Sequence, residues 1–273
     1  FWKTHATAGT GAGAAYIFIR SGTTWSQQAK LVASDAGGSD KFGADVAIDG
    51  DTVVVGASHE DAGGSNAGAA YVFTRSGTTW TQQQKLTASD AESGLVFGFS
   101  VGISGDTIVA GAWGEDTSYS NSGAAYIFTR SGTTWTQQQK IKASDAGFNN
   151  YFGSVAIEGD TIVAGASGNH VGGWGDTGAA YIFTRSGTTW SQQQKLTAST
   201  NSYYNENDNM GGRVSISGNT VIAGAIKEDT GGSNVGAAYV FTRSGTTWTQ
   251  EQKLQASDKA AGDYFGLGID IDG

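Results

Sequence analysis

The chain has 273 residues and a formal net charge of −9, with 43 glycines, no proline and no cysteine. The acidic balance argues against nucleic acid and anionic membranes as partners, because both are bound through clustered Lys and Arg. No apolar run approaches the roughly 18 residues of a membrane span, and the absence of cysteine excludes disulfides and thiol chemistry.

One stretch occurs five times almost unchanged, and Ala69–Trp80 is a representative copy. The first three intervals between its tyrosines are 55 residues (71−16, 126−71, 181−126) and the last is 58 (239−181). A fixed period of this size is typical of repeat architectures. No linker separates the copies, so residues 1–273 are predicted to form one domain. The repeat units are centred on Tyr16, Tyr71, Tyr126, Tyr181 and Tyr239.

Each unit contains four short segments with the alternation and composition of β-strands. In the unit around Tyr126, the predicted strands span 96–104, 107–112, 124–129 and 135–142. Tight turns join the first strand to the second and the third to the fourth, and longer polar loops make the other connections. Four antiparallel strands per unit describe a propeller blade. The predicted fold is therefore all-β, a five-bladed β-propeller.

The two ends of the chain are predicted to share one blade. Phe265–Asp272 corresponds to a first strand, and Phe1–His5 lies in register just after the second strand that would follow it. A divergent strand at Phe1–His5, with a shortened loop over 6–13, would then close the ring. The alternatives are that the chain is a piece of a longer array, or that another molecule supplies the strand.

The units resemble FG-GAP repeats, the family that builds the integrin α-chain propeller and many bacterial extracellular proteins. The matching residues are Phe42-Gly43, Phe97-Gly98 and Phe265-Gly266 in the first strand, and Gly56-Ala57, Gly111-Ala112, Gly165-Ala166 and Gly224-Ala225 in the second. The bacterial subfamily with a Ser-Gly-Thr-Thr-Trp motif is the nearest likeness. The resemblance implies a propeller at the cell surface or outside the cell, with a role in adhesion or recognition.

The chain departs from this family at the calcium loop. Integrin-type repeats often carry an Asp-rich loop between the first and second strands. Here that connection is a two-residue turn, as in Asp49-Gly50-Asp51. Such a turn cannot supply the six to eight oxygen ligands that calcium takes. The resemblance therefore carries over the fold without the usual metal site.

Two of the four connections differ between copies, those from the second to the third strand and from the fourth to the next first strand. Because strand direction alternates, both emerge on one face, which we call the variable face. Its exposed aromatic side chains would suit sugar rings or protein partners. The candidate ligand-binding residues are Trp113, Tyr119, Trp174, Tyr203, Tyr204 and Tyr264. Phe148 and Tyr151 also fall on this face, with Tyr151 expected in the core beside Phe152. The alternative is that the sequences of these solvent-exposed loops vary neutrally and bind nothing.

Many carboxylates fall on the same face. Pairing one from a fourth-to-first loop with a neighbouring Glu-Asp would create an oxygen site for calcium; the alternative is a solvated acidic rim. The candidates are Asp35, Asp40, Glu60, Asp61, Asp90, Glu115, Asp116, Asp145, Glu228, Asp229, Asp258 and Asp263. His5 and His170 are placed at the position of these glutamates, with His59 one residue earlier, and are expected to be exposed loop histidines.

No catalytic motif is present: there is neither a zinc-protease His-Glu-x-x-His nor a Gly-x-Ser-x-Gly elbow. The sequence predicts a non-enzyme that binds a glycan or protein through the variable face. The alternatives are a self-assembling structural protein and, more weakly, a glycan-cleaving enzyme. The recurring Arg and Trp beside each third turn are expected to stack as cation–π pairs. We interpret these pairs as holding the blade together, with a five-fold lectin site as the minority alternative.

Overall fold

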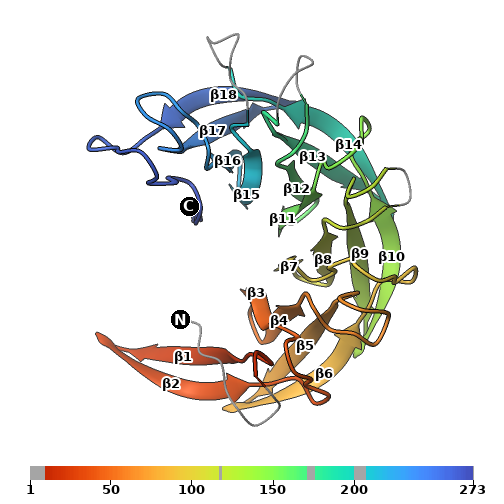
Figure 1. Ribbon diagram of the computed structural model, residues 1–273. Coiled ribbons are helices and arrows are strands. Elements are labelled where there is room, and N and C mark those ends of the chain that lie inside the picture. Colours follow the sequence, from red (N-terminus) through yellow and green to blue (C-terminus); the bar gives the residue numbers. More distant parts are fainter. Residues whose placement is uncertain (1–9, 117–118, 171–175, 200–206, 273) are drawn as a thin grey trace. The chain divides into compact units, whose positions relative to one another are not determined.

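A computed structural model describes residues 10–116, 119–170, 176–199 and 207–272. Every regular element in these ranges is a β-strand, as predicted. Figure 1 shows the strands grouped into separate small sheets. Within the described ranges there is no helix long and apolar enough to cross a membrane.

Strands follow one another in each sheet in chain order. A two-stranded sheet holds β1 (Ala15–Ser21) and β2 (Thr24–Leu31). The first four-stranded sheet holds β3 (Phe42–Asp49), β4 (Thr52–Ala57), β5 (Ala69–Ser76) and β6 (Thr79–Leu86), and the second holds β7 (Ser100–Ser104), β8 (Thr107–Ala112), β9 (Ala124–Ser131) and β10 (Thr134–Ile141). The third holds β11 (Phe152–Glu158), β12 (Thr161–Ala166), β13 (Ala179–Ser186) and β14 (Thr189–Leu196), and the fourth holds β15 (Met210–Ser217), β16 (Thr220–Ala225), β17 (Ala237–Ser244) and β18 (Thr247–Leu254).

The predicted four-stranded blade is confirmed in four repeats, but two predicted first strands need correction. The strand expected over 96–104 begins at Ser100, and before it Phe97 makes only an isolated bridge to Gly68. Residues 265–272 form no strand and make only one isolated bridge, from Phe265 to Gly236. In the other repeats this segment pairs with the second strand of its own sheet.

The chain divides into two compact units. One contains residues 1–112 and 127–137, and the other contains 113–126 and 138–273, so the division passes through the sheet β7–β10. In the first unit, Tyr71 and Phe73 of β5 pack their rings against Phe42 of β3. The second unit repeats this arrangement with Tyr181, Phe183 and Phe152.

The Phe-Gly and Gly-Ala pairs of the repeat meet where neighbouring sheets pack. A Cβ atom on Gly56 of β4 would lie 1.9 Å from the carbonyl oxygen of Gly98 in the next repeat. In the second unit, Gly165 meets the Gly211 carbonyl oxygen in the same way, again at 1.9 Å. Only glycine permits this approach of two backbones. The glycine of the Gly-Ala pair in one sheet and the glycine of the Phe-Gly position in the next sheet therefore contact each other.

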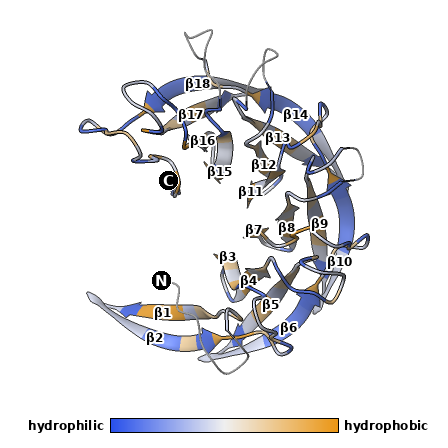
Figure 2. Ribbon diagram, in the orientation of Figure 1, coloured by the Kyte–Doolittle hydropathy of each residue, from blue (hydrophilic) through white to orange (hydrophobic). Residues whose placement is uncertain are grey.

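The third and fourth strands carry the polar contacts between neighbouring sheets. Arg130 stacks over Trp135 at 5.2 Å from the ring centroid, and Arg75–Trp80, Arg185–Trp190 and Arg243–Trp248 do the same at 5.2–5.4 Å. The Trp135 indole donates a hydrogen bond to Gln83 of β6 in the preceding sheet (3.0 Å). The predicted cation–π pairs are confirmed in four of the five copies, while the Arg20 side chain of the fifth copy donates to the carbonyl oxygen of Gly22. Figure 2 shows hydrophilic residues along β10, β14 and β18, which lie at one edge of their sheets.

Candidate ligand-binding site

Two neighbouring loops of the second unit are joined into one surface. Residues 113–123 connect β8 to β9, and residues 142–151 connect β10 to β11. The amides of Asn149 and Tyr151 donate to the carbonyl oxygens of Ser120 and Asn121, both at 2.9 Å. The side-chain amide of Asn121 also donates to that of Asn149 (3.0 Å). These bonds fix the two loops against each other.

This joining brings four aromatic rings together in two pairs. Tyr119 lies beside Phe148 with ring centroids 4.9 Å apart, and Trp113 meets Tyr151 edge-on at 5.8 Å. Phe148 is 62% exposed and Tyr119 is 43% exposed. We call these four residues the aromatic cluster. Tyr119 and Phe148 are exposed rings at a junction held by backbone hydrogen bonds, and such a ring pair offers an apolar surface to a ligand.

The buried side chain of Glu115 anchors the loop between β8 and β9. Its carboxylate is buried and accepts hydrogen bonds from Lys140 (2.7 Å) and Lys142 (2.8 Å). The Ser122 hydroxyl lies 3.2 Å from the same carboxylate, and the Glu115 carbonyl oxygen accepts the Gly123 amide. A buried carboxylate must be paired in this way to be tolerated.

The aspartate of the second loop supports the core. Asp145 accepts hydrogen bonds from the Tyr181 hydroxyl and the Lys195 ammonium, both at 2.6 Å. Burial raises the pKa of Asp145, but these two donors outweigh it and hold that pKa below its ordinary value. Burial, together with the bond to Asp145, raises the pKa of the Tyr181 hydroxyl. Both groups therefore keep their roles at neutral pH.

Of the six predicted ligand-binding aromatics, Trp113 and Tyr119 lie in the aromatic cluster. Tyr264 is exposed and lines a separate depression of 350 Å³ with Asn207, Lys227, Asp229 and Asn234. Trp174, Tyr203 and Tyr204 lie outside the described residues.

Two members of the aromatic cluster were not among these candidates. Tyr151 was expected in the core, but Phe152 alone fills that place and Tyr151 is exposed. Phe148 occupies the position held in other repeats by Gly38, Ser93 and Ala261. A large apolar residue at a position that is otherwise small is the signal that identifies it.

The predicted solvated acidic rim is wrong for the glutamates. Like Glu115, Glu60 and Glu228 are buried and pair with the lysine of their own fourth strand, Lys85 (2.8 Å) and Lys253 (2.5 Å). The aspartates after them cap their own loops: Asp61, Asp116 and Asp229 accept the backbone amides of Asn66, Asn121 and Asn234.

The remaining carboxylates lie in the fourth-to-first loops. Asp40 and Asp263 accept backbone amides of their own loops, from Gly37 and Ala260. Asp90 and Asp258 are exposed. Asp35 bonds to the Tyr71 hydroxyl (2.8 Å) and to Lys85 (2.6 Å).

The pair of Asp35 and Glu60 does not fit a calcium ion. The predicted convergence of Asp35 with Glu60 does occur, but both carboxylates bind the Lys85 ammonium. A positive charge therefore lies where the cation would have to sit. The described residues contain no group of three His, Asp or Glu side chains arranged to hold a metal ion.

The placement of His170 at the glutamate position is wrong. Asn169 takes that position, since its carbonyl oxygen accepts the Gly178 amide and its side chain accepts the Lys195 ammonium (2.7 Å). Asn169 lies three residues after Ala166, as Glu60 lies three residues after Ala57, but the loop from Asn169 to the next tyrosine is one residue longer. His170 is exposed beside Asp176, and the half-buried His59 bonds to Ser58 and Lys41. His5 lies outside the described residues.

Comparison with known proteins identifies the repeat. The model of the FG-GAP repeat matches residues 25–73, 80–128, 135–183, 190–241 and 248–273. Each match begins at the tryptophan of a fourth strand, and the first four end in the third strand of the next sheet. The sequence repeat is therefore offset by one strand from the sheet. No curated protein matches the chain. The chain belongs to the FG-GAP repeat family.

Proposed function

We propose that this chain is a non-catalytic recognition module, located outside the cell or on its surface, which binds a glycan or protein through the aromatic cluster. FG-GAP repeats are integrin-like repeats of adhesion and recognition modules. The observation that carries the proposal is the pairing of Tyr119 with Phe148 and of Trp113 with Tyr151 on two joined loops.

The chemistry of the cluster favours a glycan or an apolar protein side chain. Flat ring faces pack against the C–H face of a sugar or against apolar groups, and the tyrosine hydroxyls offer hydrogen bonds at the edge. The nearby carboxylates Glu115 and Asp145 are occupied by lysine and tyrosine. They support the loops, which agrees with binding without catalysis.

Binding to a broad glycan array tests this function, with calcium and with chelator. We expect binding that survives chelation, because no metal is needed to place the rings. Phe148→Ser should weaken binding at least tenfold, because removing a central aromatic anchor typically costs about 2 kcal/mol of binding free energy. Phe18→Ser is the matched control, since Phe18 is 52% exposed and Phe148 is 62% exposed.

Equal loss in both variants, or binding that vanishes with chelator, would contradict the aromatic site. If the folded wild-type protein bound no glycan on the array, the proposal of a glycan ligand would be wrong. A protein partner or self-association would then be sought by light scattering against concentration.

We further propose that the repeats form a five-bladed propeller in which the two ends share one blade. The sheet β1–β2 contains strands of only the third and fourth kind. Residues 265–272 carry the sequence of a first strand and, beyond the bridge at Phe265, belong to no sheet. The two segments are complementary parts of one blade.

A further inference from the structure

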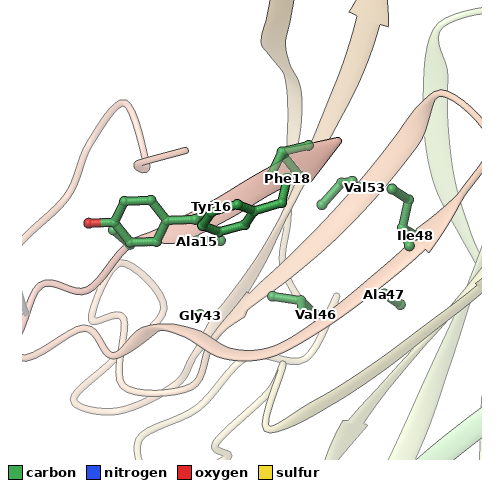
Figure 3. A pocket seen from close by; sticks show the side chains of 10 residues that line it. Ala15, Tyr16, Phe18, Gly43, Val46, Ala47, Ile48 and Val53 are labelled. Atoms are coloured by element: carbon green, nitrogen blue, oxygen red, sulfur yellow. The ribbon is translucent and has the colours of Figure 1, made fainter. Parts of the chain in front are cut away.

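In the part of the chain that the structure describes, the sheet β1–β2 has an open edge beside an apolar cavity. Within the described residues, β1 pairs only with β2. Figure 3 shows the cavity of 430 Å³ between β1 and β3, with Tyr16 and Phe18 on one side and Val46 and Ile48 on the other. Unpaired backbone groups beside an apolar surface are a template for an added strand.

The other repeats show what covers this surface. In the first unit, the edge of β5 is paired with β4, which also packs against β7. Phe73 of β5, the counterpart of Phe18, is 4% exposed. Ile103 of β7 is 8% exposed, whereas its counterpart in β3, Ile48, is 61% exposed. In the first unit a second strand therefore covers the surface that corresponds to the one left exposed between β1 and β3.

The register of β4 on β5 defines how such a strand would lie. Val53 faces Phe73 and Val55 faces Tyr71. Transferred to β1, these positions face Phe18 and Tyr16. The second strands read Thr-Val-Val-Val-Gly-Ala, Thr-Ile-Val-Ala-Gly-Ala (twice) and Thr-Val-Ile-Ala-Gly-Ala.

The cavity also selects for glycine at one position. Gly43 lines it and corresponds to Gly98, whose carbonyl oxygen leaves no room for a Cβ atom on Gly56. A strand seated here must carry glycine opposite Gly43. The segment predicted to fill this place, Phe1–His5, lies outside the described residues and contains no glycine.

We propose that the open edge of β1 is a binding site for an extended peptide with the second-strand sequence of the repeat. The peptide, supplied by another FG-GAP repeat segment, adds antiparallel to β1. Its apolar side chains fill the cavity, and its glycine lies against Gly43. The site lies within the first unit and does not depend on the aromatic cluster.

Titration of the full chain with a fluorescent peptide tests the proposal. The peptide has the sequence of residues 105–112, preceded by two lysines for solubility, and its anisotropy reports binding. We expect saturable binding, together with slowed hydrogen exchange of the β1 amides. A control peptide with Gly111→Val, otherwise identical, should bind at least tenfold more weakly.

Two protein variants locate the site. Ile48→Asp places a charge in the cavity at an exposed position and should weaken peptide binding at least tenfold. Phe148→Ser should leave it unchanged, although it disrupts the proposed ligand site. No binding of the wild-type peptide, equal binding of the two peptides, or unchanged exchange in β1 would overturn the proposal.

Discussion

Two tryptophans at the same position of the repeat illustrate how neighbours decide the role of a residue. Trp135 is 2% exposed, lies under Arg130 and bonds to Gln83, while Trp25 is 63% exposed. The sequence around them is nearly identical. Trp135 lies in a four-stranded sheet and contacts the sheet before it, whereas Trp25 lies in a sheet of two described strands, so equivalent side chains contribute unequally to stability.

Replacing these tryptophans measures that difference. Trp135→Ala should lower the free energy of unfolding by about 3–5 kcal/mol, because it leaves a buried cavity and an unpaired glutamine. Trp25→Ala should cost less than about 1 kcal/mol, since little is buried. Denaturant unfolding of both variants gives the comparison. Equal effects would show that the burial of Trp135 does not matter.

Asp208 is predicted to make stability depend on pH. Burial, and then the nearby Glu228 carboxylate, raise its pKa to about 6 from an ordinary value of 3.8. The folded state therefore holds a proton that the unfolded state has lost, and this contribution to stability is lost as pH rises from about 4 through 6. Lys253 opposes the shift and Asp229 adds to it.

Asp208→Asn should remove this dependence. The equivalent position in the preceding repeat is already an asparagine, Asn150. The backbone carbonyl oxygen of Asn150 accepts the Gly168 amide, and the backbone carbonyl oxygen of Asp208 accepts the Lys227 amide in the same way. We expect the variant to be more stable than the wild type at pH 7, by about 1–3 kcal/mol, and to differ little at pH 4. Urea unfolding across this range would contradict the prediction if both proteins changed in parallel.

At the scale of the element, the strands and turns follow local rules while the sheets join through backbone contact. Both hairpin turns are two residues long and begin with a glycine of positive φ, such as Gly105 (56°) and Gly132 (62°). Such turns match the twist of the flanking strands. Gly56 in β4 serves a different purpose, because it admits the carbonyl oxygen of Gly98.

Alanine at these two kinds of glycine should have unequal effects. Gly105→Ala places a Cβ atom in open space and costs only the left-handed conformation, about 1–2 kcal/mol. Gly56→Ala forces backbone apart and should cost about 3 kcal/mol. Thermal unfolding of the two variants tests the order, and a larger loss from Gly105→Ala would refute the role of the glycine contact.

At the scale of the whole molecule, the proposed closed ring has a measurable size. A compact chain of this length should have a radius of gyration of about 19 Å in solution X-ray scattering. Closure reduces exposed apolar surface and strand edge, both of which favour association. A clearly larger radius for the monomer would contradict a ring whose ends share one blade.

The sequence by itself determined the repeat, the four strands of the four complete sheets apart from the start of one of them, and the turns between strands. These features depend on alternation and on turn residues within a few positions, which are local and recur with the period. It also led to Trp113 and Tyr119, because they stand in loops that vary between copies.

Only the tertiary structure decided which loop residues meet. Phe148 and Tyr151 joined the aromatic cluster because backbone hydrogen bonds connect two loops about 30 residues apart in the chain. The glutamates became buried anchors because each finds a lysine on its own fourth strand. Such pairings depend on contacts between distant segments, which local patterns do not encode.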